Sequence, residues 1–352
     1  MKIDFGKKKI GIGTPVFIIA EIGVNHEGSL DVCLEMVRQA AWAGADAIKL
    51  QTVDPDENYV KGHPSWELFR TCQLTQDETS KVFNLSWELG MEPFTTSPDI
   101  ATLCWIDKLG VPGHKISSGM MTNDVIIKKT CALGKPVLIS TGMATTEQID
   151  HAVEVAKASG NQNIALFQCT SEYPAPKENL NLATMEWMSK RYNLPIGFSD
   201  HSIGIEAAIV AVSLGAAMIE KHFSLDCKRQ GFDHKIALDP QGFKDLVEGV
   251  RAAEEGGEKF AKENAQHYDV MIGIAERVLP PNIKEKAAGN LRCLVARKPI
   301  RAGERFTEEN VGLKRPFADK RGLEPIYYER VLRGNSVSSL DVDDPINIED
   351  VV

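Results

Sequence analysis

The sequence lacks the features that mark secreted, membrane-spanning or disulfide-stabilised proteins. No apolar run approaches the ~18 residues that a membrane span requires. The opening MKIDFGKKKIGIG carries charge but not the apolar segment of a signal peptide. The seven cysteines are scattered and form no CxxC pair, which is typical of reduced thiols. We therefore expect a cytoplasmic protein without a membrane partner.

The sequence also lacks an excess of positive charge. Its 40 Lys and Arg stand against 49 Asp and Glu, and the net charge of -9 argues against nucleic-acid binding as the main role. With 43% hydrophobic and 25% charged residues, the chain is neither disordered nor fibrous. At about 150 residues per domain, the 352 residues predict about two domains, or one large barrel with a small appended domain.

Eight short apolar runs recur along the first three-quarters of the chain and predict buried strands, because they show little alternation. They are VFIIAEIG (16-23), DAIKLQ (46-51), EPFTTS (92-97), GHKISS (113-118), PVLIST (136-141), IALFQC (164-169), PIGFSD (195-200) and MIEKHF (218-223). Segments with helical periodicity lie between them. Several of these segments stop at a glycine before the next strand, at Gly44, Gly90, Gly110, Gly134, Gly160 and Gly215.

This alternation predicts an α/β fold with a closed (β/α)8 TIM barrel. An open doubly wound sheet is the alternative, disfavoured by the count of eight strands and by the absence of a GxGxxG turn after the first strand. We expect the barrel over residues 1-258 and a polar linker with a short helix over 259-289. Short strands with turn residues then predict a small β-rich domain over 290-352, which we expect to dock onto the barrel.

Polar side chains stand near the carboxyl ends of all eight predicted strands, where barrel enzymes place their catalytic groups. They are Glu21, Asn25, His26, Lys49, Gln51, Thr96, Ser97, Lys115, Ser118, Ser140, Thr141, Thr170, Tyr173, Ser199, Asp200, His201, Glu220 and His222. Six of them (Lys49, Ser97, Lys115, Ser118, Ser140 and Ser199) would together hold a phosphate or carboxylate. Taken singly, each lysine is compatible with a surface position and each serine with a helix cap. Two lysines inside apolar strands, however, need partners, because an unpaired buried charge is costly.

Two histidines stand at the ends of the last two predicted strands, which are neighbours in the barrel. His201 and His222, converging with Glu21, suit a divalent metal with open positions for water and substrate. Hydrogen-bonded core histidines are the alternative. Asp233 and His234 follow the last strand and add polar groups at the same mouth, which favours the metal interpretation.

Nine motifs, read in order, resemble the N-acetylneuraminate (sialic acid) synthase family, including its pseudaminate, legionaminate and spore-coat relatives. They are IAEIGVNHEGSL, KLQ, KISSG, ISTGM, QCTSEYP, IGFSDHS, IEKHF, FDHKIALDP and LKRP. The last of them lies in the terminal domain, which is similar to the antifreeze-like (SAF) domain. The resemblance implies condensation of phosphoenolpyruvate with an N-acetylated hexose such as N-acetylmannosamine, giving a nine-carbon 2-keto-3-deoxy acid and phosphate.

The resemblance also implies roles for particular residues. The two lysines and four serines would form the phosphoenolpyruvate pocket. His201 and His222 would hold Mn²⁺, with Mg²⁺ or Co²⁺ as alternatives. Glu21, Gln51, Tyr173 and Asp233 would handle water or the sugar, with Glu21 as the base. Arg315, by itself an ordinary surface arginine, would reach the active site of the partner subunit in a domain-swapped homodimer.

The sequence departs from the family pattern at three positions that could alter sugar specificity or the fit of the terminal domain. Met120 stands where an acidic residue is common, Phe232 replaces a proline, and Phe317 replaces a glycine. Two other functions remain open. A Schiff-base aldolase would use Lys49 or Lys115, and a carbohydrate-binding protein would carry the terminal domain on an inactive barrel.

Overall fold

The computed structural model describes residues 1–352 except for the side chain of residue 288. The strands are β1 Lys2–Phe5, β2 Lys8–Gly11, β3 Phe17–Gly23, β4 Ala47–Gln51, β5 Glu92–Thr96, β6 His114–Ile116, β7 Val137–Ser140, β8 Ile164–Cys169, β9 Ile196–Asp200, β10 Met218–His222, β11 Cys293–Ala296 and β12 Val311–Lys314. The helices are α1 Leu30–Ala43, α2 Pro55–Asn58, α3 Pro64–Thr71, α4 Gln76–Glu88, α5 Ile100–Lys108, α6 Asp124–Ala132, α7 Thr146–Ala158, α8 Thr184–Tyr192, α9 Glu206–Ser213, α10 Pro240–Asn264, α11 Tyr268–Ile272, α12 Pro281–Asn290 and α13 Tyr328–Val331.

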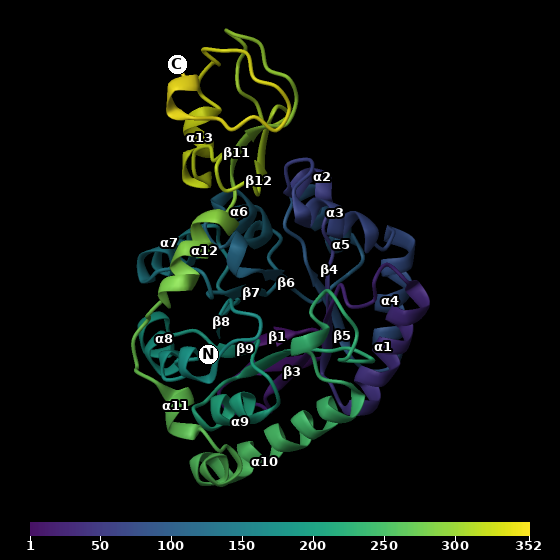
Figure 1. The fold of residues 1–352 in the computed structure, drawn as a ribbon. Helices are drawn as coiled ribbons and strands as arrows, with labels where there is room; N and C mark the ends of the chain where they lie inside the picture. Colours follow the sequence, from purple (N-terminus) through teal and green to yellow (C-terminus); the bar gives the residue numbers. More distant parts are fainter.

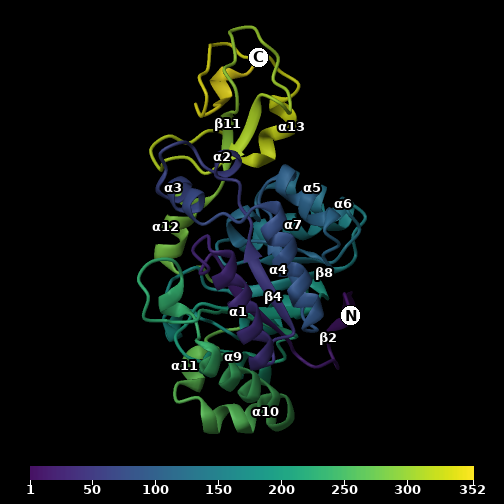
Figure 2. The same ribbon diagram turned by 90° about the vertical axis from the view of Figure 1, so that its right-hand side faces the viewer.

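The strands β3 to β10 close into a parallel barrel in chain order, with β10 pairing both β9 and β3. Helices surround this barrel, and the C-terminal domain sits at one end of the molecule, beside α2 and α6 (Figures 1 and 2). All eight predicted strands are therefore confirmed, and the closed barrel excludes the open sheet. The six predicted helix-terminating glycines have φ between 74° and 90°, the left-handed conformation that glycine adopts without a steric penalty.

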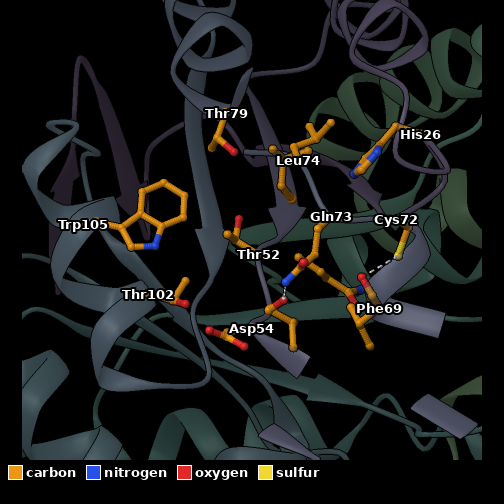
Figure 3. Close-up of a pocket in the computed structure, with 13 residues that line it drawn as sticks. His26, Thr52, Asp54, Phe69, Cys72, Gln73, Leu74, Thr79, Thr102 and Trp105 are labelled. Atoms are coloured by element: carbon orange, nitrogen blue, oxygen red, sulfur yellow. Dashed lines mark hydrogen bonds between the residues drawn. The ribbon is translucent and has the colours of Figure 1, made fainter. Parts of the chain in front are cut away.

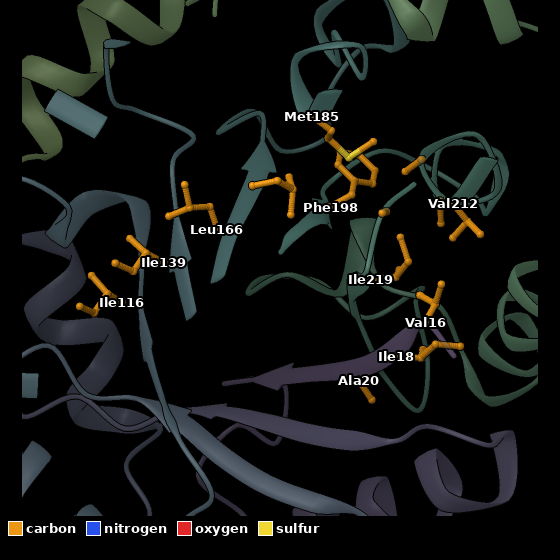
Figure 4. Packing of buried hydrophobic residues seen from close by; sticks show 14 of the residues in the cluster. Val16, Ile18, Ala20, Ile116, Ile139, Leu166, Met185, Phe198, Val212 and Ile219 are labelled. Atoms are coloured by element: carbon orange, nitrogen blue, oxygen red, sulfur yellow. The ribbon is translucent and has the colours of Figure 1, made fainter. Parts of the chain in front are cut away.

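Alternation along each strand separates two apolar layers. Ile18, Ile116, Ile139, Leu166 and Ile219 point outward and pack against the helices, as Figure 4 shows. Their neighbours of opposite parity point into the barrel, where Phe17, Ile19, Phe94, Leu138, Phe167 and Met218 form the lower core. Successive strand residues face opposite sides, so inner-face residues recur at every second position. On each strand, the next inner-face residue toward the carboxyl end therefore lies directly above this core.

An N-terminal hairpin closes the bottom of the barrel, a feature that the sequence analysis did not predict. β1 and β2 pair antiparallel and contribute Ile3, Phe5 and Ile10 to the inner core. Phe5 is fully buried and contacts the rings of Phe17 and Phe94 edge-on or tilted, at centroid distances of 5.4 and 5.1 Å. Burying one such ring stabilises the fold by about 1.5–3 kcal/mol. Because this end of the barrel is closed by apolar side chains, the polar side chains of a functional site gather at the opposite, carboxyl end.

The segment expected to be a polar linker is more structured than predicted. α10 continues to Asn264 across a kink at Gly257 (φ 58°, ψ -146°), and two further helices, α11 and α12, lead to the C-terminal domain. Met271 of α11 is buried, and its carbonyl accepts a hydrogen bond from the Leu182 amide at 2.9 Å. An apolar anchor of this kind holds the connection against the barrel.

The C-terminal domain has its own small core, built from Leu294, Ile300, Phe306, Val331 and Ile346. β11 and β12 pair antiparallel, and isolated bridges such as Ile300 with Leu340 extend the pairing. The β-rich domain predicted from turn residues is therefore present, although most of its pairing is too short to form long strands. Within the described structure, no helix is both long enough and apolar enough for a membrane span.

Candidate active site

A pocket of about 190 Å³ opens at the carboxyl end of the barrel. Every barrel strand contributes to its lining, which reflects the rule that parallel strands bring their carboxyl ends to one edge. Among the residues predicted from the sequence, the lining includes Glu21, Lys49, Gln51, Lys115, Ser118, Ser140, Tyr173, Ser199, His201, His222 and Arg315. These residues come from segments up to about 290 positions apart in the chain, and the closed barrel brings them together.

Two predicted site residues lie outside the lining. Ser97 is buried directly after β5, between Thr96 and Pro98, and both of those neighbours line the pocket. The alternation of side chains along extended backbone therefore turns Ser97 away from the cavity. Asp233 stands at the edge of the site, with one carboxylate oxygen 3.6 Å from Nδ1 of His222.

The floor of the pocket is an ion-pair network that shares one lysine between two carboxylates. The Lys49 ammonium lies 3.0 Å from a Glu21 oxygen and 3.4 Å from a Glu220 oxygen. The Lys115 ammonium also pairs with Glu220, at 3.3 Å. Glu220 accepts a further hydrogen bond from Ser199 at 2.9 Å, and Glu21 accepts one from Gln51 at 2.9 Å. All four charged residues are at most 5% exposed, so the two lysines have the partners that their burial requires.

The network separates the pKa values of its two carboxyl groups. Burial raises the pKa of Glu21 to about 7, against the attraction of Lys49 and with the help of the negative charge on Glu220. Burial also acts to raise the pKa of Glu220, but Lys115 and Lys49 together outweigh it and lower that pKa to about 2. Glu220 is therefore a permanent anion, whereas Glu21 can gain or lose a proton near neutral pH. Such a division of roles is typical of acid–base sites.

The two lysines differ as well. Burial lowers the pKa of Lys115 because only part of its desolvation is offset by Glu220. For Lys49, the attraction of Glu21 and Glu220 outweighs desolvation and raises the pKa. Lys49 is therefore the more firmly charged of the two.

His201 and His222 face each other at the mouth, with ring centroids 5.5 Å apart. Burial, with Lys49 nearby, lowers the pKa of His222 to about 3; burial, with His222 nearby, lowers that of His201 to about 4. Both rings are thus neutral at pH 7. Nδ1 of His201 lies 2.7 Å from the Thr170 carbonyl, an acceptor, so this nitrogen carries the proton and Nε2 carries the lone pair.

This donor set fits a metal that takes two imidazoles and completes its coordination from water and substrate. Nδ1 of His222 is buried and has no hydrogen-bond partner in the part of the chain that the structure describes. The described side chains provide no group of three or more His, Cys, Asp or Glu ligands. Any bound ion would therefore keep several positions open, as a catalytic metal requires.

A fully buried ion pair on the outer side of the barrel holds the histidine-bearing strands together. The Lys221 ammonium lies 2.8 Å from an Asp200 oxygen and donates to the Ser202 carbonyl at 2.6 Å. Asp200 also accepts from the Ser202 amide at 2.8 Å. Lys221 and Asp200 are the immediate neighbours of His222 and His201 in the sequence. Their ion pair on the outer side of the barrel therefore fixes the backbone that carries both imidazoles.

The C-terminal domain packs against the segment after β4 and contributes Arg292 and Arg315 to the pocket lining. The Arg315 amide donates to the Asn58 carbonyl at 2.9 Å, and the Val60 amide donates to the Arg315 carbonyl at 3.2 Å. Val60 also packs against Cys293 and Val295 of β11. Arg315 thus lines the pocket together with residues of the same chain. Its reach into the partner subunit of a domain-swapped homodimer stays a prediction.

The three departures from the family pattern lie around the site in different settings. Met120 is buried in the main core, so it offers no polar contact to a substrate. Phe232 has a positive φ of 46° and contacts the His234 ring edge-on at 6.0 Å. Phe317 contacts the His63 ring at 5.7 Å, between the C-terminal domain and the loop after β4.

A second, smaller pocket of about 120 Å³ adjoins the first and shares Gln51, Val53 and Phe69 with it. Figure 3 shows His26, Thr52, Gln73 and Trp105 around this space, with the Gln73 amide donating to the Val53 carbonyl at 2.9 Å. Burial lowers the pKa of His26 to about 4, so its ring is neutral here. This second pocket, with its mixed polar and aromatic lining, extends the main pocket beside β4.

Several residues of the site were not predicted from the sequence. Glu220 is one of the predicted strand-end side chains but has no predicted role, although its position two residues before His222 places both on the inner face. Tyr59 and Arg292 also line the pocket, from the loop after β4 and from the start of the C-terminal domain. No periodic pattern marks these two residues, because neither lies on a barrel strand.

The sequence matches the model of the NeuB family over residues 36–261. The chain belongs to the NeuB family. The C-terminal domain matches the SAF domain over residues 292–352. Both matches confirm the resemblance drawn from the nine motifs, and with them the fold of a TIM barrel followed by a SAF domain.

The family relatives align over nearly the whole chain. An uncharacterized protein of Methanocaldococcus jannaschii, MJ1065, is 34% identical over 351 residues, covering 100% of this chain and 99% of that protein. A pseudaminic acid synthase of Campylobacter jejuni is 33% identical, covering 90% of this chain and 91% of the synthase. The crystal structure of the spore coat polysaccharide biosynthesis protein SpsE of Bacillus subtilis has a TM-score of 0.89 at 29% identity, covering 100% of this chain and 99% of that one.

Proposed function

We propose that this protein condenses phosphoenolpyruvate with an N-acetylated hexose, N-acetylmannosamine or a related sugar, to form a sialic-acid-type nonulosonate and phosphate. Membership of the NeuB family and the similarity to a pseudaminic acid synthase support a synthase of this class. The observation that carries the proposal is the single pocket in which two buried ammonium groups, several hydroxyls, a carboxyl group of raised pKa and two neutral imidazoles converge.

Binding of phosphoenolpyruvate would use Lys49 and Lys115 as charged donors and Ser118, Ser140 and Ser199 as directional hydroxyl donors. Oxyanions bound by several such groups are held in one orientation. Fixing the enol carbon against the sugar aldehyde lowers the entropic cost of bringing two substrates together. Glu220, a permanent anion, would keep both lysines charged and aligned.

In the chemical step, the enol carbon of phosphoenolpyruvate attacks the aldehyde carbon, and the new C–C bond takes the electrons of the enol double bond. The aldehyde oxygen gains a proton. Water then adds to the cationic carbon that bears the phosphate oxygen and loses a proton. The tetrahedral intermediate expels phosphate by C–O cleavage, and loss of the hydroxyl proton leaves the keto group. Glu21 would accept a proton from water or a sugar hydroxyl, and its pKa of about 7 supports this role.

We also infer a divalent cation, Mn²⁺, Mg²⁺ or Co²⁺, held by His201 and His222. When bound there, it would supply Lewis-acid polarisation of the sugar aldehyde. The neutral state of both imidazoles supports this inference, because a protonated imidazole has no lone pair to donate.

The test of the proposed function measures phosphate release from phosphoenolpyruvate in the presence of a panel of N-acetylated aldehydic sugars. We expect release only when a sugar is present, with one new nonulosonate per phosphate. Borohydride is expected not to trap either substrate on the protein, because Lys49 and Lys115 are both engaged in ion pairs. Covalent trapping would instead support the Schiff-base aldolase, and glycan binding without phosphate release would support the binding protein.

Replacing either lysine by methionine is expected to weaken phosphoenolpyruvate binding far more than sugar binding. Loss of a charge-assisted contact to an anion costs about 1.5–3 kcal/mol, or roughly a tenfold to hundredfold rise in KM. Lys115→Met is the cleaner variant, because Glu220 retains Lys49 and Ser199 as partners. Lys129→Met, at an exposed position on α6, is the control. If the sugar KM rose instead, the two substrate subsites would be exchanged.

The pH profile is expected to report the protonation of Glu21. Below about pH 7 the carboxyl group is protonated and cannot accept a proton, so kcat/KM should fall on the acid side. Glu21→Gln should remove this limb and lower kcat by about 10²–10⁴-fold. Glu220→Gln serves as the comparison: the variant should lose activity but keep an acid limb, which moves to lower pH because the charge of Glu220 no longer raises the pKa of Glu21. An unchanged limb in Glu21→Gln would assign the base to another group.

A further inference from the structure

Arg292 carries a buried guanidinium group with unused hydrogen-bonding capacity. The residue lies immediately before β11 at the start of the C-terminal domain, and its side chain lines the active-site pocket. Only 4% of the residue is exposed, yet its Nε and Nη1 atoms have no hydrogen-bond partner among the described residues. Guanidinium nitrogens can only donate, and leaving them buried without an acceptor is unfavourable. Their partner is therefore to be sought in a ligand.

A second guanidinium stands beside the first. The central carbons of Arg292 and Arg315 lie 5.1 and 5.5 Å from the centre of the same Tyr59 ring. Arg315 donates from Nε to the Asn290 carbonyl at 3.1 Å, and its Nη2 atom lies near Gly119, next to Ser118. Burial and the charge of Arg315 lower the pKa of Arg292 to about 10, so the Arg292 guanidinium remains charged at neutral pH.

The charges of the pocket do not balance without an anion. Lys49 and Lys115 are compensated by Glu21 and Glu220. Apart from these four groups and the neutral histidines, the charged residues of the lining are Arg292 and Arg315, and no ion pair to a carboxylate joins either of them within the described structure. Two positive charges therefore face the cavity unneutralised. A phosphate or carboxylate group supplies the charge and the planar, multiple acceptors that a pair of guanidinium forks binds best.

We propose that Arg292, with Arg315 beside it, binds an anionic oxygen group of a substrate, a phosphate or a carboxylate, at the side of the pocket formed by the C-terminal domain. The inference rests on the proposed function for the identity of that substrate. Two sources of the group are compatible with the geometry: phosphoenolpyruvate itself, or an acidic substituent on the sugar.

Binding measurements without turnover distinguish these sources. Calorimetric titrations would use phosphoenolpyruvate, N-acetylmannosamine and N-acetylmannosamine 6-phosphate with the wild type, Arg292→Met and Arg292→Lys. Arg301→Met, an exposed arginine of the same domain, is the control. Arg292→Met should weaken the ligand whose anion it holds by about tenfold to a hundredfold. Arg292→Lys should fall between, because an ammonium keeps the charge but not the fork.

A weaker phosphoenolpyruvate affinity identifies phosphoenolpyruvate as the source, and a loss confined to the sugar phosphate identifies the sugar. Either result supports the proposal. Unchanged affinity for both anions in Arg292→Met would overturn it. Affinity for the neutral sugar should not change in any variant.

Thermal unfolding separates binding from a structural role and remains informative if the proposed reaction fails. In ligand-free protein, Arg292→Met removes an unpaired buried charge, so its Tm should equal or exceed that of the wild type. Inorganic phosphate should raise the Tm of the wild type and of Arg301→Met more than that of Arg292→Met. A lower ligand-free Tm combined with an unchanged phosphate effect would show that Arg292 only supports the domain contact. If Arg292→Met does not fold, the same comparison with Arg292→Lys decides.

Discussion

Removal of divalent cations is expected to abolish turnover, and His222→Ala is expected to abolish both turnover and metal binding. A Lewis acid at the aldehyde supplies several kcal/mol of transition-state stabilisation, so kcat should fall by more than about a hundredfold. The imidazole of His222 is buried among polar groups at the mouth of the barrel and does not lie in the apolar core. The variant should therefore remain folded while it loses the ion.

The measurement combines metal analysis of the purified protein, activity after chelation and re-addition of Mn²⁺, Mg²⁺ or Co²⁺, and thermal unfolding. His114→Gln is a matched control, because His114 is also a buried strand histidine but pairs with Asp107 at 3.1 Å outside the pocket. This control should keep its metal and its activity. Full turnover after exhaustive chelation would rule out the inferred ion.

Mixing two inactive variants, Arg315→Ala and His201→Ala, is expected to leave the mixture inactive. Arg315 lines the pocket of its own barrel, held there by backbone hydrogen bonds to Asn58 and Val60. Arg297 and Glu57 add an ion pair between the same two domains. Each chain in the mixture would then still carry one defect in its own site, whatever its partner.

The experiment requires differently tagged chains, co-purification to establish whether the two variants share an assembly, and an assay of that mixed fraction. Each variant alone is the control. Partial recovery of activity would show that the C-terminal domain is exchanged between chains, because only then does a mixed dimer contain one site with neither defect. This outcome would restore the domain-swapped arrangement that the family resemblance implied.

The barrel could be predicted because its strands carry a local signal. Segments such as PVLIST and IALFQC are apolar throughout, as strands buried on both faces must be, and the observed β7 and β8 lie within them. The N-terminal hairpin could not be predicted in the same way. Its residues Lys2, Asp4, Lys8 and Lys9 are polar, and the burial of Ile3, Phe5 and Ile10 depends on the open end of a barrel formed by later segments.

Part of the site followed from the same local signal. Polar residues at strand ends, such as Lys49, Lys115 and His222, share the inner parity of their strands, so a closed barrel must bring them together. Ser97 shows the limit of this argument. It stands beyond the end of β5, where the parity turns it away from the pocket, and its neighbour Thr96 lines the cavity instead.

The sequence by itself determined the strand order, the barrel, the terminal domain and most of the polar residues at the mouth, because these depend on local apolar patterns and on the fixed direction of parallel strands. Only the tertiary structure decided how the charges are shared. The separation of the Glu21 and Glu220 pKa values arises because Lys115 and Lys49 both pair with Glu220, whereas Glu21 pairs with Lys49 alone and its burial dominates. The pairing of Arg292 with Arg315 arises where the C-terminal domain meets Tyr59. Electrostatic effects depend on distances of a few ångströms between distant segments, and only the folded chain sets those distances.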